Sequence, residues 1–98
     1  MTESLFPDGA TTHGRSARAP ATGTCGMVAS AHPFATRAGV EALQDGGNAI
    51  DAAVAVASTL NVVEPYMSGM AGIGVALVYI PAENRTRVLN FSGNAPQA

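Results

Sequence analysis

The chain has 98 residues, of which 47% are hydrophobic and only 12% are charged, and its formal net charge is −2. Its five basic residues are scattered, so it lacks the clustered positive charge with which proteins bind nucleic acids or anionic membranes. The single cysteine, Cys25, excludes an internal disulfide and has no second cysteine near it for a metal site. No apolar run reaches the roughly 18 residues of a membrane-spanning helix. We therefore expect neither nucleic acid nor a membrane as a partner.

Residues 1–25 are predicted to form a flexible leader ahead of a folded segment at residues 26–98. The leader is rich in Thr, Ala, Gly, Ser and Pro and shows no sustained hydrophobic period, which is typical of extended or disordered chain. It also lacks the uninterrupted apolar core of a secretory signal. The sequence as it stands predicts a cytoplasmic protein, whereas a start of translation further upstream would allow a periplasmic or secreted one.

The first regular elements expected are a short strand at residues 27–31 and an amphipathic helix at residues 33–45. The strand follows Gly26 and should stop before Pro33, because proline cannot donate to a sheet. In the helix, small apolar residues recur at helical spacing, and proline stands in the first turn. The apolar positions are Ala35, Ala38, Gly39, Ala42 and Leu43, and the polar ones opposite them are Arg37, Glu41 and Gln44.

A second helix is predicted over residues 48–60, with Asn48 as its N-cap. The glycine pair at 46–47 supplies the left-handed backbone that ends the first helix, and Asn48 can accept hydrogen bonds from the first free amides of the second. Asp51 stands where its carboxylate can reach back to the cap amide. Residues 52–57 carry no polar side chain, and a helix that is apolar all round must be covered on every side. We therefore expect the chain to be the first piece of a longer protein, or to need a partner.

The last part of the chain is predicted to form a glycine-rich turn and a β-hairpin. Pro65 ends the second helix, because a residue before proline is pushed out of the helical region. Residues 68–74 form the glycine-rich turn. Two strand-like runs, residues 75–80 and 87–91, then bracket a turn at 81–86. The order strand, helix, helix, hairpin indicates an α+β fold.

The residues by themselves show no catalytic equipment. The glycine-rich turn follows a helix and precedes a strand, whereas a phosphate-binding loop leaves a strand and opens a helix. His13 and His32 have no carboxylate or cysteine at ligand spacing, and no serine stands in the Gly-x-Ser-x-Gly frame of a nucleophile elbow. Glu64 is expected to be a surface carboxylate at a helix end. We expect no metal and no cofactor, and a small ligand-binding module built on the glycine-rich turn is one alternative to an enzyme.

Three segments stand in a fixed order, namely MVASAHPFATRAGVEALQDGGNAIDAAVAVA, LNVVEPYMSGMAGIGVALVYI and LNFSGNAP. Together they resemble the beginning of the γ-glutamyltransferase (γ-glutamyltranspeptidase) family of N-terminal nucleophile hydrolases. The resemblance implies that residues 26–98 are the N-terminal fragment of a four-layer αββα sandwich. It also implies a precursor that cuts itself into two subunits, with this chain as the amino-terminal part of the large subunit.

The resemblance also implies a reaction. Members of the family transfer or hydrolyse a γ-glutamyl or related small amide through an acyl-enzyme, formed on the new amino-terminal Thr of the small subunit. The family pattern places this Thr and the glycine amides of the oxyanion hole downstream of the segment represented here. The implied partners are therefore the rest of the large subunit, the small subunit and a small amide such as glutathione, and no catalytic residue is carried onto this chain.

The segment after the last predicted strand departs from the family's pattern. Typical members carry an Arg-Glu-x-Ala-Pro motif whose arginine grips the α-carboxylate of the glutamyl substrate, and the aligned residues here read Ser-Gly-Asn-Ala-Pro from Ser92 to Pro96. A serine hydroxyl cannot reproduce a bidentate guanidinium grip. The alignment makes Ser92 and Asn94 the candidate substrate-binding residues. Two alternatives stay open: an oxamate-type amidohydrolase without glutamyl specificity, since some relatives read Ser-Gly-Arg-Ala-Pro, and a catalytically inert truncated fragment.

Overall fold

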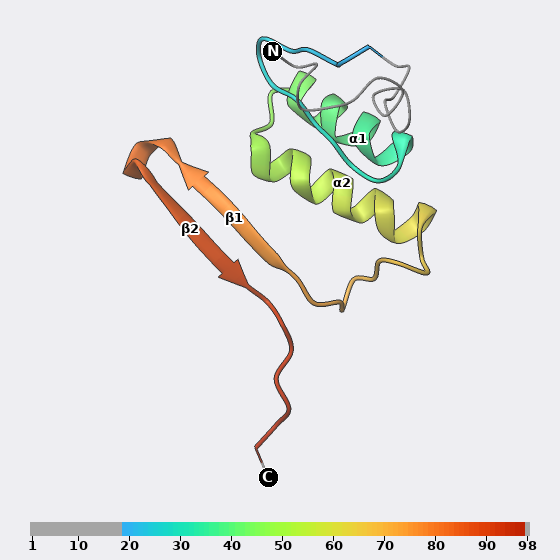
Figure 1. Cartoon of the computed structure of the whole chain (residues 1–98), viewed down its shortest axis with the longest axis vertical. Coiled ribbons are helices and arrows are strands. Elements are labelled where there is room, and N and C mark those ends of the chain that lie inside the picture. Colours follow the sequence, from blue (N-terminus) through green and yellow to red (C-terminus); the bar gives the residue numbers. More distant parts are fainter. Residues whose placement is uncertain (1–18, 98) are drawn as a thin grey trace, which may run out of the picture.

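A computed structural model of the chain describes residues 19–97, and within them the predicted α+β composition is confirmed. Two helices lie side by side, and a two-stranded antiparallel sheet lies apart from them (Figure 1). The predicted leader falls mostly on residues 1–18, outside the described residues, and residues 19–25 are exposed chain without helix or strand. The elements in chain order are α1 (Pro33–Gln44), α2 (Ala49–Val63), β1 (Val75–Ile80), a short 3-10 helix η2 (Pro81–Glu83) and β2 (Arg85–Asn90).

Helix α1 forms where the apolar spacing predicts it. His32 is its N-cap, and the His32 Nδ1 accepts a hydrogen bond from the backbone N–H of Phe34 at 3.1 Å. Proline takes the first helical position, where its missing N–H costs no helical hydrogen bond. The helix ends one residue earlier than predicted, and Gly46 then takes a φ of 94°, the left-handed conformation that glycine tolerates best.

Helix α2 begins with the capping box that the sequence predicts. The Asn48 Oδ1 accepts from the N–H groups of Ile50 and Asp51 at 2.9 and 3.0 Å, and the Asp51 Oδ2 accepts from the Asn48 N–H at 2.9 Å. The predicted end near residue 60 is wrong, because the helix continues to Val63. A proline restricts only the residue before it, and that residue is Glu64, which leaves the helical region with a φ of −131°.

The two helices run in opposite directions and touch through very small side chains. Ala35 of α1 is fully buried and Ala52 of α2 is 5% exposed. A β-carbon added to Gly39 would stand 2.7 Å from the Val56 Cγ2 and 2.8 Å from the Val28 Cγ1, both closer than real carbon contacts. Glycine at this position therefore lets α2 and the chain before α1 approach the α1 backbone.

The strand predicted at residues 27–31 is wrong for this structure. The segment is extended but belongs to no sheet, and within residues 19–97 the only sheet consists of β1 and β2. Its contacts are with α1, through Val28 on Gly39 and through the Ser30 hydroxyl, which lies 2.7 Å from the Thr36 Oγ1. A strand exists only where a neighbouring strand supplies backbone partners, so local propensity alone does not create one.

The hairpin pairs residue 75 with residue 90 at one end and residue 80 with residue 85 at the other. Its turn is η2 followed by Asn84 in the left-handed region, and the Tyr79 hydroxyl donates to the Asn84 Oδ1 at 2.9 Å. Strand β2 therefore begins two residues earlier than predicted and ends one residue earlier, at Asn90. This turn is shorter than the predicted six-residue turn, so the pairing between the two strands extends closer to it.

Several apolar side chains on α2 and on the hairpin remain exposed. On α2, Ile50, Val54 and Val62 are 54%, 61% and 79% exposed, because α1 covers only one side of this helix. On β1, Leu77 is 75% exposed. None of the helices found in residues 19–97 combines the length and hydropathy needed to cross a bilayer.

Candidate substrate-binding segment

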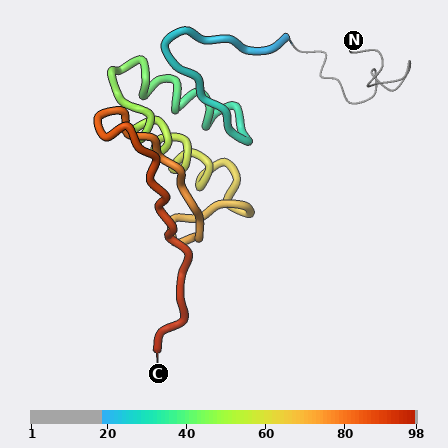
Figure 2. Tube along the Cα trace, turned by 60° about the vertical axis from the view of Figure 1, so that its left-hand side comes forward, coloured from blue at the N-terminus to red at the C-terminus, as the bar shows by residue number. Residues whose placement is uncertain are grey.

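The two candidate binding residues lie on the segment that follows β2, which we call the exit segment (residues 91–97). It forms no helix or strand, and all of its residues are exposed, Ser92 and Asn94 included. Figure 2 shows it leaving the hairpin and running away from both helices. The structure therefore brings Ser92 and Asn94 onto one short segment and presents both to solvent.

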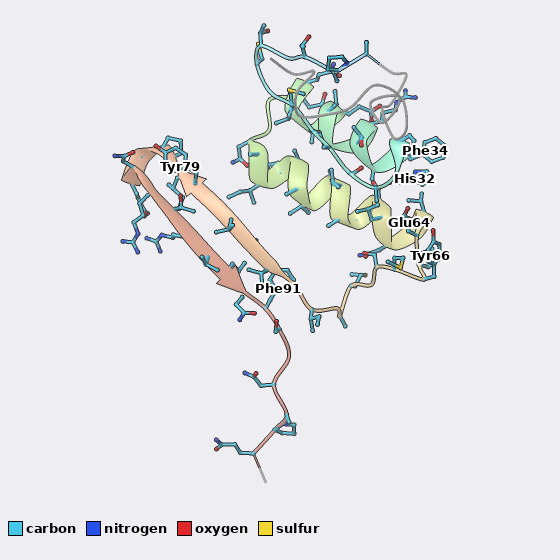
Figure 3. The ribbon with its side chains drawn as sticks, viewed as in Figure 1. His32, Phe34, Glu64, Tyr66, Tyr79 and Phe91 are labelled. Carbon is cyan, nitrogen blue, oxygen red and sulfur yellow. The ribbon has the colours of Figure 1, made fainter. Side chains whose placement is uncertain are left out.

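The exit segment is attached to the glycine-rich turn (residues 68–74) through Phe91 and Gly74. The Phe91 N–H donates to the Gly74 carbonyl at 3.1 Å, one step beyond the last strand pair. The Phe91 ring covers the same glycine, since a β-carbon on Gly74 would stand 2.5 Å from the ring Cζ and 2.6 Å from Cε2. Gly74 has no positive φ, so the ring, rather than the backbone conformation, requires glycine here. The two segments consequently meet at one end of the hairpin (Figure 3).

Asn90 shapes the first turn of the exit segment. Its side-chain Oδ1 accepts a hydrogen bond from the Ser92 N–H at 3.0 Å. A side chain that bonds a backbone amide two residues ahead offers the chain an alternative to the sheet ladder. This bond occupies the Ser92 amide, while the Ser92 side chain remains exposed.

The other end of the glycine-rich turn is attached to α2. The Ser68 hydroxyl donates to the Asn61 Oδ1 at 2.5 Å, and the Glu64 carbonyl accepts from the N–H groups of Met67 and Ser68, both at 3.0 Å. Between its two attachments the turn presents exposed apolar residues, with Met70 95% exposed. The turn runs from a helix into a strand, as the sequence predicts, whereas a phosphate-binding loop leaves a strand and opens a helix.

The three arginines of residues 19–97, Arg37, Arg85 and Arg87, all lie outside the exit segment. Arg37 pairs with Glu41 on α1 at 2.8 Å. Arg87 pairs with Glu83 at 2.8 Å, and Arg85 is paired in register with residue 80, so both lie toward the turn end of the hairpin. At about 3.4 Å per strand residue, Arg85 lies roughly 17 Å and Arg87 roughly 10 Å along β2 from Asn90. The exit segment itself offers hydroxyl, amide and backbone groups, which form neutral hydrogen bonds.

The other residues that the sequence analysis considered lie outside the exit segment. His32 caps α1, Glu64 is half-buried at the end of α2, and Cys25 is exposed. His13 falls outside the described residues. Among residues 19–97 no group of three His, Cys, Asp or Glu side chains is placed to hold a metal ion.

A groove of about 620 Å3 lies between residues 25–29 and α2, and it is remote from the exit segment in sequence. Its lining is made of small and aliphatic residues, with Asn48 and the Cys25 thiol as its polar side chains. It holds no carboxylate, imidazole or guanidinium, so it offers no acid or base for catalysis.

Asn90 is the residue of this site that the sequence reasoning did not identify. The signal was available, because asparagine at the end of a strand commonly bonds the backbone two residues ahead. The contact between Phe91 and Gly74 had no such signal, since it joins two residues that the whole hairpin separates in sequence.

Comparison with known proteins identifies the family. A profile described as gamma-glutamyltranspeptidase matches residues 35–98. The chain is 49% identical over 74 residues to a glutathione hydrolase proenzyme of Bacillus subtilis, and 47% identical over 77 residues to the acylase ACY 1 proenzyme of a Pseudomonas species. These alignments cover 76% and 79% of this chain but only 13% and 14% of the two relatives. The chain thus spans about an eighth of the length of the relatives it matches.

A solved structure agrees with the sequence comparison. The structure of Helicobacter pylori gamma-glutamyltranspeptidase superposes with a TM-score of 0.73 at 40% identity, over 79% of this chain and 22% of that one. The arrangement of two helices and a β-hairpin is therefore shared with a solved member of the family. With its sequence and its fold both matched, the chain belongs to the gamma-glutamyltranspeptidase family.

Proposed function

We propose that this chain forms the amino-terminal part of the large subunit of an enzyme that transfers or hydrolyses a γ-glutamyl or related small amide. The reaction proceeds through an acyl-enzyme on a Thr that lies downstream, outside residues 1–98. The chain's own part is to build one edge of the substrate site and to carry the two helices and the hairpin of the surrounding scaffold.

The observation that supports this function most directly is the match to a protein named glutathione hydrolase proenzyme at 49% identity over 74 residues. The relatives' names favour glutathione-like amides over the oxamate-type alternative. The acylase ACY 1 relative extends the class to other amides, because it is 47% identical over a similar length. The common chemistry of both groups is cleavage of an amide bond with transfer of the acyl group.

The exposed apolar faces support the proposal of a larger assembly. Ile50 and Val54 of α2 and Leu77 of β1 are all more than half exposed, and an apolar face of this kind is stable only when another layer covers it. In our proposal, the remaining layers of the αββα sandwich, supplied by the rest of the large subunit and the small subunit, provide that cover.

In this function Ser92 and Asn94 are proposed to bind the acyl part of the substrate. They lie on the exposed exit segment, where the family alignment expects the substrate's α-carboxylate to be held. Their hydroxyl and amide groups can donate hydrogen bonds to a carboxylate, although each such bond is weaker than the bidentate pair of a guanidinium.

The test is a chimaera of the Bacillus subtilis relative in which residues 26–98 of this chain replace the matching segment. We expect the chimaera to process itself into two subunits and to hydrolyse a γ-glutamyl anilide. Oxamate serves as the second substrate, and the unaltered relative serves as the reference for both reactions.

Two results would overturn the proposal. A chimaera that folds and is processed but cleaves neither substrate would show that these residues belong to an inert form. Cleavage of oxamate without cleavage of the γ-glutamyl anilide would assign the segment to the alternative amidohydrolase.

A further inference from the structure

The end of the hairpin next to the exit segment is fixed by two different contacts from adjacent residues. Phe91 extends the strand pairing by one hydrogen bond to Gly74 and covers that glycine with its ring. Asn90, the last paired residue of β2, turns its side chain onto the Ser92 amide. One contact holds the start of the exit segment to the sheet, and the other sets the direction in which it leaves.

The consequence concerns Ser92, which follows both contacts directly. A segment that follows a strand but has no pairing partner samples many conformations, and ordering each of its residues costs about 1–2 kcal/mol. The bond from Asn90 removes part of this freedom before any ligand binds. A side chain that must meet a ligand benefits from such preorganisation, because less ordering is left to oppose binding.

We propose that Asn90 is a positioning residue for the acyl-donor site, and that it acts by holding the Ser92 backbone in its binding conformation against the anchor of Phe91 on Gly74. This inference rests on the proposed function, because it assigns a role to the same exit segment. Asn90 acts through Ser92 and does not itself touch the substrate, so its loss should weaken binding and leave the chemical step unchanged.

The test uses the chimaera with three substitutions at two positions. Asn90→Ala removes the acceptor, and we expect KM for the γ-glutamyl anilide to rise about three- to tenfold, the range of one neutral hydrogen bond, with little change in kcat. Asn90→Asp keeps an oxygen acceptor for the Ser92 amide, but its negative charge opposes a substrate carboxylate, so KM should recover only in part. Thr86→Ala is the matched control, because Thr86 is also exposed on β2 but pairs with residue 79 toward the turn end.

A second measurement keeps this inference separate from the proposed function. Amide hydrogen exchange in the peptide that contains Ser92 can be followed whether or not the chimaera is active. We expect faster exchange in Asn90→Ala than in the parent, in Asn90→Asp or in Thr86→Ala. Unchanged exchange would overturn the positioning role even in an inactive chimaera.

In an active chimaera, KM and kcat decide between positioning and a merely structural role. A structural role would lower the thermal midpoint and the yield of processed enzyme while KM stayed constant, and that result would contradict the inference. An unchanged KM in Asn90→Ala would also contradict it. Failure of the parent chimaera to cleave the anilide would count against the proposed function alone.

Discussion

The Phe91 ring lies directly over Gly74, so closely that a β-carbon on the glycine would stand 2.5 Å from the ring Cζ. The backbone N–H of Phe91 also donates to the carbonyl of the same glycine. These contacts join the glycine-rich turn to the exit segment, two parts of the chain that β1 and β2 separate in sequence (Figure 3). The position of the exit segment therefore depends on one residue that has no side chain.

Replacing Gly74 tests this relationship most directly. Gly74→Ala should lower the thermal midpoint of the chimaera, because the new methyl group overlaps the Phe91 ring, and overpacking of this kind costs about 1–3 kcal/mol. Gly69→Ala is the matched control, since a β-carbon at Gly69 would meet nothing within 4 Å. Thermal denaturation of the two variants side by side measures the difference.

The double variant Gly74→Ala with Phe91→Ala gives the complementary result. Removing the ring removes the overlap. The Gly74→Ala substitution should therefore lower the thermal midpoint less in the Phe91→Ala background than in the parent chimaera. Equal costs in the two backgrounds would mean that the ring does not lie over Gly74.

The contact between the helices predicts a similar effect at Gly39. Alanine improves helix propensity by about 1 kcal/mol over glycine. In this position, however, its methyl group would overlap Val56 of α2 and Val28, and we expect the overlap to outweigh the gain. In the chimaera, a lower thermal midpoint for Gly39→Ala, partly restored by Val56→Ala, would support this packing, and a higher midpoint for Gly39→Ala would contradict it.

The capping box of α2 predicts a stability loss at Asn48. Asn48→Ala removes the oxygen that accepts from two amides of the first turn, and the loss should be about 1 kcal/mol. Asn48→Ser keeps a capping oxygen and should cost much less. Denaturant midpoints of the two variants and the parent, all in the chimaera, measure the difference, and equal midpoints would show that the cap does not stabilise this helix.

Because the exit segment is neutral, an arginine introduced there should strengthen substrate binding. If Ser92 stands where a substrate carboxylate is held, Ser92→Arg in the chimaera should lower KM for the γ-glutamyl anilide by about tenfold, because a guanidinium forms charge-assisted hydrogen bonds. The gain should shrink as salt is added, because salt screens the attraction between the guanidinium and the substrate carboxylate.

Thr86→Arg is the control for this effect, because it adds the same charge to β2 toward the turn end. It should leave KM unchanged. An equal fall of KM in both variants would attribute the gain to net charge rather than to the position of Ser92.

The isolated chain should not unfold cooperatively. Within residues 19–97 the buried hydrophobic residues are two alanines, Ala35 and Ala52, and burial of such small side chains contributes little at about 25 cal/mol per Å2. Circular dichroism during heating should show a gradual loss of helix, with sedimentation giving the state of association. A sharp transition in a monomer would show that this segment folds independently.

The sequence by itself determined the local structure and the family. The helix limits near Pro33 and Asn48 depend on residues within one turn of each cap, and the capping box of Asn48 and Asp51 follows from their spacing. Local hydrogen bonds need no distant partner, which is why both helices and the hairpin were predicted. The family followed from three linked segments, and the match over residues 35–98 confirms it.

The tertiary structure decided what depends on contacts between distant residues. Residues 27–31 have the composition of a strand, but a strand needs a neighbour to complete its hydrogen bonds, and the described chain places α1 there instead. The need for glycine at position 74 arises from the ring of Phe91, just beyond the end of β2, and the Ser92 amide is held by Asn90, the last residue of β2. Local spacing determines which elements form, whereas packing between elements determines which residues meet at the proposed site.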